Sequence, residues 1–141
     1  MYAYRVLWMF LLGVALAAPD FGRWYPFPQA QALAQEHARV LMVYFHSAHC
    51  PYCEQMNTFV LSDPAVSRLL EERFVVASVG TDTPEGQELA RRFRVPGTPT
   101  FVFLVPRKGA WEEVGRLFGS RPRAQFLAEL RQMCAKGGAC E

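Results

Sequence analysis

Two cysteines separated by two residues, Cys50 and Cys53, are the side chains of this sequence best suited to chemistry. They lie between an apolar run typical of a buried strand, residues 40–45, and a stretch of helix-forming residues, 54–61. Cys50 is therefore expected at the start of a helix, where free backbone N–H groups and the helix dipole stabilise a thiolate. Since only the thiolate attacks a disulfide, we expect Cys50 to be the nucleophile and Cys53 the resolving thiol.

A Cys-x-x-Cys pair has other possible uses, which the neighbouring residues help to weigh. His46 and His49 stand just upstream, so that the four side chains resemble a zinc ligand set in spacing. Such crowded ligands would have to come from a strand end, a loop and one helical turn, which disfavours a metal. Haem attachment requires a histidine directly after the second cysteine, where Glu54 stands. A purely structural disulfide is the remaining alternative, and redox exchange without a metal or organic cofactor is the preferred interpretation.

A second motif, residues 96–100, has the sequence Pro-Gly-Thr-Pro-Thr and directly precedes another strand-like run. A cis bond between Thr98 and Pro99 would present the Thr98 backbone beside the cysteines, ready to hydrogen-bond an extended substrate. The alternative is an ordinary trans proline before a strand. We expect Thr98, Pro99 and Tyr52 to form the substrate-binding surface.

His49 directly precedes the proposed nucleophile. Charged, it would stabilise the Cys50 thiolate, and neutral, it would shuttle a proton, so we count it as a candidate catalytic residue. The alternative is an exposed loop histidine without a role.

Cys134 and Cys140 form a second pair near the end of the chain, with Gly137 and Gly138 between them. The glycines allow the chain to fold back, which favours a small structural loop closed by a disulfide. A redox relay with Cys50 and Cys53 is the alternative, since four cysteines allow three connectivities.

The first residues have the pattern of a secretory signal peptide. A short positive start at Arg5 is followed by an apolar run, 6–16, and by the small-x-small sequence at 15–17, so that the mature chain would begin near Ala18. The run is shorter than the roughly 20 residues that span a bilayer, although an uncleaved anchor remains an alternative. We therefore expect a periplasmic or otherwise extracytoplasmic protein, in a compartment where disulfides persist.

The formal net charge of +2 excludes the basic footprint of a nucleic-acid-binding protein. The length fits one domain, which we expect to be a monomer.

The periodicity predicts helices over 29–37, 54–61, 65–73, 84–93 and 122–133, and strands over 40–45, 74–79, 100–105 and 111–117. From residue 40 onward the order is β-α-α-β-α-β-β-α. This order predicts an α/β fold, with a mixed central sheet flanked by helices and ending in an antiparallel hairpin. The proline- and aromatic-rich residues 19–28 read as an extended lead-in.

From Val40 to about Met133, the chain resembles the thioredoxin superfamily, in particular exported thioredoxin-like proteins of the SoxW and thioredoxin-related type. The residues that carry the resemblance are 44–56, around the cysteines, and 95–101, around Pro99. The resemblance implies a thioredoxin-like fold with the Cys-x-x-Cys at a helix N-terminus. We accordingly divide the chain into a signal peptide (1–17), a lead-in with the first helix (18–38), a thioredoxin-like domain (39–133) and a cysteine-containing tail (134–141).

His49, Pro51 and Tyr52 differ from the Trp-Cys-Gly-Pro-Cys of cytoplasmic thioredoxins, and two positions on the predicted strands also depart from the thioredoxin pattern. Tyr44 stands where such proteins have a buried aspartate, and Ser78 stands where they have its lysine partner. The usual proton acceptor for the resolving cysteine is thus missing, and Glu54, water or His49 would have to replace it. Cys-Pro-Tyr-Cys is also found in glutaredoxins, but those proteins usually have Thr-Val-Pro at the second motif.

The resemblance implies an exported thiol–disulfide oxidoreductase that reduces or exchanges disulfides of cysteine-containing extracytoplasmic proteins. It further implies that electrons come from a membrane thiol transporter of the CcdA or DsbD type. Apocytochromes and sulfur-carrier proteins of the Sox pathway are candidate clients. The alternatives are an oxidase that donates disulfides and a metal-handling module that uses the cysteines as ligands.

Overall fold

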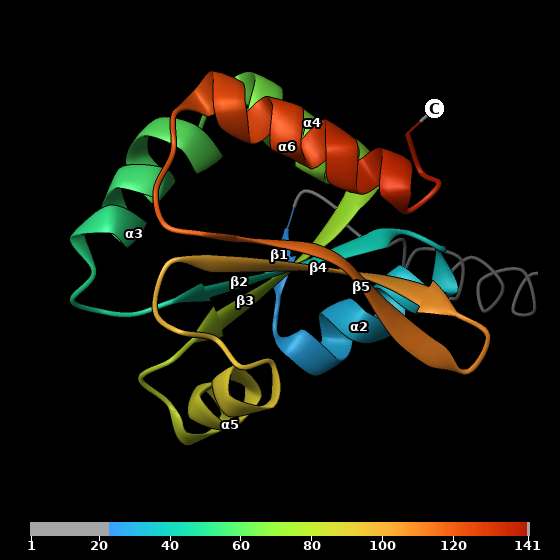
Figure 1. The fold of residues 1–141 in the computed structure, drawn as a ribbon, viewed down its shortest axis with the longest axis horizontal. Coiled ribbons are helices and arrows are strands. Elements are labelled where there is room, and N and C mark those ends of the chain that lie inside the picture. Colours follow the sequence, from blue (N-terminus) through green and yellow to red (C-terminus); the bar gives the residue numbers. More distant parts are fainter. Residues whose placement is uncertain (1–22, 141) are drawn as a thin grey trace, which may run out of the picture.

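The computed structural model describes residues 23–140, which form a five-stranded mixed sheet in the order β1-β3-β2-β4-β5 (Figure 1). The strands are β1 (Trp24–Tyr25), β2 (Val40–His46), β3 (Phe74–Gly80), β4 (Thr100–Arg107) and β5 (Ala110–Phe118). β1 and β2 run parallel to β3, β4 runs antiparallel to β2, and β4 and β5 form a hairpin. The predicted α/β fold and its closing hairpin are therefore confirmed.

Helices cover both faces of the sheet (Figure 1). On one face lie α2 (Phe27–Glu36) and α5 (Pro84–Arg92); on the other lie α3 (Pro51–Met56), the π-helical turn η1 (Asn57–Leu61), α4 (Pro64–Arg73) and α6 (Arg123–Lys136). Side chains of β2 alternate between these layers: Val43 packs on the first face and Met42 on the second. Both faces of β2 are buried, which explains its continuous apolar sequence.

Proline and polar caps begin several of the helices. Asp63 accepts hydrogen bonds from the Ala65 and Val66 N–H groups at the start of α4, and the Thr83 hydroxyl accepts one from Gly86 N–H at the start of α5. A proline in the first turn of each of these helices fits a position that needs no backbone donor. α3 starts in the same way, with Pro51 in its first turn.

The structure differs from the sequence-based elements in the bounds of several of them. Residues 19–28 were expected to be an extended lead-in outside the sheet, but Trp24 and Tyr25 form β1 and pair with Val76 and Ala77 of β3. As expected from the position of Cys50, the helix that carries the cysteines begins at Pro51, whereas the last five residues of the predicted stretch 54–61 form the π-helical turn η1. α6 continues to Lys136, so that Cys134 lies inside its last turn.

Within residues 23–140, no helix is both long and apolar enough to cross a membrane. The predicted signal peptide, 1–17, lies outside the described residues, as does residue 141 of the predicted tail.

Candidate active site

Cys50 is the residue that caps α3, directly after the loop that leaves β2. Its backbone is extended (φ −131°, ψ 95°), and its Sγ accepts a hydrogen bond of 3.1 Å from the Cys53 N–H group. The two cysteines are joined in a disulfide, with Cα atoms 5.2 Å apart, and both are buried. The sulfur of Cys50 thus lies at the positive end of α3, against a backbone donor that would also hold a thiolate.

The loop before β4 lies beside the cysteines, although it is almost fifty residues away in sequence. The Thr98–Pro99 bond is cis, as expected from the motif. The Thr98 hydroxyl donates a hydrogen bond of 3.4 Å to Cys50 Sγ, and Ser47 Oγ lies 2.9 Å from Thr98 Oγ1. The two motifs singled out in the sequence therefore meet at one sulfur atom.

Exposed side chains form the rim of this site. Tyr52 is 64% exposed on the first turn of α3, and His49 is exposed in the loop before Cys50. Phe118, at the end of β5, is 56% exposed and lies beside Gly97 of the Pro99 loop. The next residue, Gly119, donates its N–H to the Pro99 carbonyl at 2.9 Å.

Phe118 and Gly119 were missed in the sequence analysis. The available signal was the hairpin register, because Phe118 pairs with Thr100, which directly follows Pro99. The end of the last strand must therefore lie next to the Pro99 loop.

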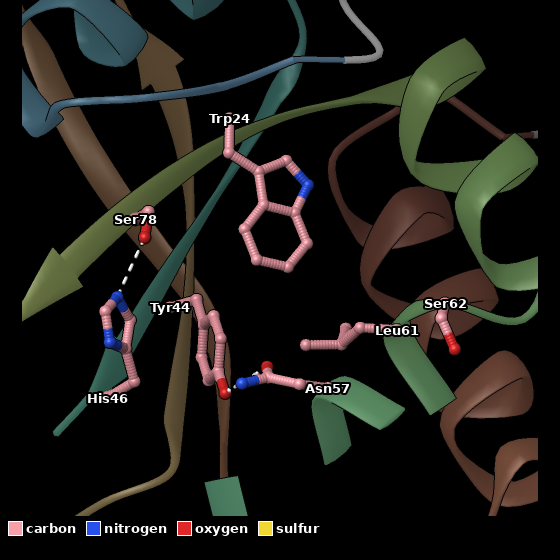
Figure 2. Close-up of a pocket in the computed structure, with 7 residues that line it drawn as sticks. All are labelled: Trp24, Tyr44, His46, Asn57, Leu61, Ser62 and Ser78. Atoms are coloured by element: carbon pink, nitrogen blue, oxygen red, sulfur yellow. Dashed lines mark hydrogen bonds between the residues drawn. The ribbon is translucent and has the colours of Figure 1, made fainter. Parts of the chain in front are cut away.

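A cavity of about 340 Å³ lies between the sheet and the start of η1 (Figure 2). Its lining residues are Trp24, Tyr44, His46, Asn57, Leu61, Ser62 and Ser78. Tyr44 and Ser78, the two positions that depart from the thioredoxin pattern, are direct neighbours on β2 and β3. The Tyr44 hydroxyl donates a hydrogen bond of 2.8 Å to Asn57 Oδ1, and Ser78 Oγ lies 2.8 Å from His46 Nε2.

Burial raises the pKa of Tyr44 to about 12, although the hydrogen bond with Asn57 partly opposes this shift. Tyr44 therefore stays protonated at neutral pH and donates to Asn57, so it cannot replace the missing aspartate as a proton acceptor. Burial also lowers the pKa of His46, against the charge of Asp82, which raises it. His46 is thus a neutral imidazole at neutral pH, and it lines the cavity. Glu54 and His49, the acceptors suggested by the sequence, are exposed outside this cavity.

Cys134 and Cys140 form a second disulfide at the other end of the sheet. Gly137, between them, packs against Val40, the first residue of β2, whereas Cys50 follows the last. The length of β2, seven residues, separates the two disulfides by roughly 20 Å. This separation argues against the direct relay that the sequence left open.

Within residues 23–140, no group of three or more His, Cys, Asp or Glu side chains is arranged to hold a metal ion. Of the two histidines considered as ligands, His46 is bonded to Ser78 and His49 is exposed.

Comparison with known proteins identifies the family. A model of the thioredoxin-like domain matches residues 27–134. The chain belongs to this family. Curated relatives include the thiol:disulfide interchange protein DsbD of Yersinia pestis (strain Pestoides F), 31% identical over 106 residues, and that of Salmonella typhi, 29% identical over 101 residues. These matches cover 74% and 71% of this chain but only 18% of each relative, so the chain spans less than a fifth of their length.

Solved structures agree with this assignment. A thioredoxin from Thermus thermophilus is 83% identical, with a TM-score of 0.79 over 84% of this chain and 91% of that one. The C-terminal domain of Neisseria meningitidis DsbD in the oxidised form shares the fold at 24% identity, with a TM-score of 0.59 over 78% of this chain and 98% of that one. The Cys50–Cys53 disulfide thus lies on the fold of a member of the thioredoxin-like family.

Proposed function

We propose that this protein is exported and that it reduces or exchanges disulfides of cysteine-containing proteins outside the cytoplasm. The observation that carries the proposal is the position of Cys50 Sγ, at the start of α3 and within hydrogen-bonding distance of the Cys53 N–H and the Thr98 hydroxyl. Two features support export: the signal-like residues 1–17, and a second disulfide that would persist in an oxidising compartment.

In the reduced protein, the Cys50 thiolate attacks one sulfur of a client disulfide. A bond forms between Cys50 Sγ and that sulfur, while the other client sulfur leaves as a thiolate and takes up a proton. Cys53 then loses its proton and attacks Cys50 Sγ, which closes the Cys50–Cys53 disulfide and releases the second client sulfur as a thiolate. Two electrons thus pass from the protein to the client.

The exposed rim would receive the client chain. Tyr52 on α3 and Phe118 beside the Pro99 loop offer apolar contacts, and the Thr98 backbone offers hydrogen bonds to an extended segment. His49 would favour the Cys50 thiolate when charged.

A membrane thiol transporter of the DsbD or CcdA type would return the protein to its dithiol form. Its own dithiol would attack the Cys50–Cys53 disulfide and would itself become a disulfide. The similarity to DsbD supports a partner of this class, because DsbD is itself named for thiol:disulfide interchange.

The activity is tested by insulin reduction with dithiothreitol as electron donor. We expect Cys50→Ser to abolish turnover, and the double variant Cys134→Ala/Cys140→Ala, as matched control, to keep it. Wild-type turnover in Cys50→Ser, or loss of turnover in a folded control variant, would contradict the proposal.

The direction of electron flow is tested by equilibrating the Cys50–Cys53 pair with thiol buffers of known potential. A value near that of thioredoxin, about −270 mV, supports a reductase. A value near that of the oxidant DsbA, about −120 mV, makes the protein a disulfide donor instead. Export is tested by fractionating the native host: a mature chain beginning near Ala18 outside the cytoplasm supports it, and an uncleaved chain in the cytoplasm overturns it.

A further inference from the structure

Three side chains from two distant loops form a chain of contacts that ends on the nucleophile. Ser47 lies in the loop between β2 and α3, three residues before Cys50, and is partly buried. Its Oγ is 2.9 Å from Thr98 Oγ1, which is 3.4 Å from Cys50 Sγ. The order along the chain of contacts is therefore Ser47, Thr98, Cys50.

The number of protons gives this arrangement a direction. A threonine hydroxyl has a single proton, so when Thr98 donates to Cys50 Sγ, its oxygen can only accept from Ser47. A thiolate has no proton to donate, and therefore only one orientation satisfies all three groups: Ser47 donates to Thr98, and Thr98 donates to Cys50. Hydrogen bonds in such a series polarise one another, so the second donor strengthens the first.

We propose that Ser47 is a positioning residue that stabilises the Cys50 thiolate through Thr98, by fixing the direction of the Thr98 hydroxyl. The inference rests on the proposed role of Cys50 as nucleophile. In the proposed mechanism, Ser47 itself contacts neither Cys50 Sγ nor the client.

The loop that carries Ser47 has separate anchors. The Asp82 carboxylate accepts a hydrogen bond of 2.7 Å from the Ala48 N–H, and the His46 carbonyl accepts one of 2.8 Å from the Thr81 N–H. Removal of the Ser47 hydroxyl is thus expected to leave the loop in place. The other donor to the sulfur, the Cys53 N–H, belongs to α3 and is also unaffected.

The ionisable group adjacent to Cys50 in the reduced protein is the Cys53 thiol. The others nearby are His49, Tyr52 and Glu54 along the chain, Asp82 at the loop and His46 at the end of β2. None of them changes in the variants proposed below. A difference in the titration of Cys50 between the variants therefore reports the hydroxyl groups alone.

The test measures the rate of alkylation of Cys50 in the reduced protein as a function of pH, with the modified residue identified by peptide mass spectrometry. We expect Thr98→Val to move the midpoint of the profile upward by about one pH unit, the effect of one hydrogen bond to a charged acceptor. Ser47→Ala should move it upward by roughly a quarter as much. Ser47→Thr, which keeps a hydroxyl, should restore the wild-type profile.

The double variant Ser47→Ala/Thr98→Val is decisive, because Ser47 acts only through Thr98. Its midpoint should equal that of Thr98→Val alone. Ser120→Ala is the control, since it removes a hydroxyl that bonds Gln55 on the same helix without reaching the sulfur. A wild-type profile for Ser47→Ala, or additive shifts in the double variant, would overturn the inference. If Cys53 is alkylated faster than Cys50 in the wild type, the proposed function fails as well.

Discussion

The two disulfides of this protein lie at opposite ends of the sheet. One is at the start of its helix, and the other is at the end of a different helix. Cys50 caps the N-terminus of α3, whereas Cys134 lies in the last turn of α6. The positive end of a helix stabilises a thiolate and the negative end destabilises it. The two disulfides are chemically alike, but Cys50 faces the positive end of a helix and Cys134 lies near the negative end of one.

The residues around the two pairs also favour a thiolate at Cys50 and disfavour one at Cys134. Cys50 Sγ has two hydrogen-bond donors and lies below an exposed rim, ready to meet another chain. Cys134 is fully buried in the apolar cluster between the sheet and α6. Apolar burial opposes the thiolate, so the second pair is poorly suited to exchange. The comparison teaches that the surroundings, rather than the disulfide itself, distinguish an exchanging pair from a structural one.

The largest expected effect is on thiol reactivity. After full reduction under native conditions, Cys50 should react with iodoacetamide on the order of a hundredfold faster than Cys134, because its thiolate is stabilised and its side chain keeps 7% exposure, whereas Cys134 is fully buried. The rates are measured by quenching at intervals and counting modified peptides. In denaturant, where both helices are lost, the difference should vanish. Equal rates in the folded protein would remove the proposed contrast between the two pairs.

The next effect concerns stability at the Cys134 end. The double variant Cys134→Ala/Cys140→Ala should lose about 2 to 3 kcal/mol of unfolding free energy, because the unfolded chain is no longer constrained by the loop. Urea titration measures this loss, and insulin reduction at a temperature where the variant is folded should be unchanged. Loss of turnover in the folded variant would show that Cys134 and Cys140 take part in electron transfer and are not a purely structural pair.

A close approach of the backbone at this end provides a third test. A Cβ atom on Gly137 would lie 2.4 Å from Val40 Cγ2 and 2.9 Å from Val105 Cγ1. Gly137→Ala should therefore cost about 2 kcal/mol through overpacking. Gly80→Ala is the matched control, since its Cβ would meet only His46 at an ordinary 3.6 Å. Similar urea midpoints for both variants would show that the tail does not need this close contact.

The features predictable from the sequence were those carried by local patterns. Cys50, Cys53 and Pro99 lie in short motifs, and the long strands and helices follow from uninterrupted apolar runs and periodic faces. β1 was missed because two residues, Trp24 and Tyr25, are too few to show alternation.

Apart from the approach of Thr98 to the cysteines, which the Pro99 motif predicts, side-chain contacts between distant segments could not be predicted in this way. Ser47 and Thr98 are 51 residues apart, and nothing in either local sequence indicates that their hydroxyls meet. The bond from Tyr44 to Asn57 likewise depends on where η1 places Asn57 against the sheet. The residues that tune the site, in contrast to those that react, were thus found only in the structure.

The smallest expected effect is on stability at the Cys50 end of the sheet. There Tyr44 and Asn57 form a polar contact beneath α3, whereas the Cys134 end is packed by apolar side chains. Tyr44→Phe removes the hydrogen bond to Asn57 and should cost about 1 kcal/mol at pH 7. Because Tyr44 has its pKa raised to about 12 by burial, only the unfolded chain ionises it between pH 10 and 12, and the stability that it contributes falls across that window. The stability advantage of wild type over the variant, measured by urea titration, should therefore fall from pH 10 to pH 12 and change sign within that window. The exposed Tyr52→Phe serves as control and should leave the unfolding free energy unchanged at pH 7. A free-energy difference between wild type and Tyr44→Phe that stays constant up to pH 12 would mean that Tyr44 ionises alike in the folded and the unfolded protein. Tyr44 would then be as accessible to water as the exposed residues of the rim.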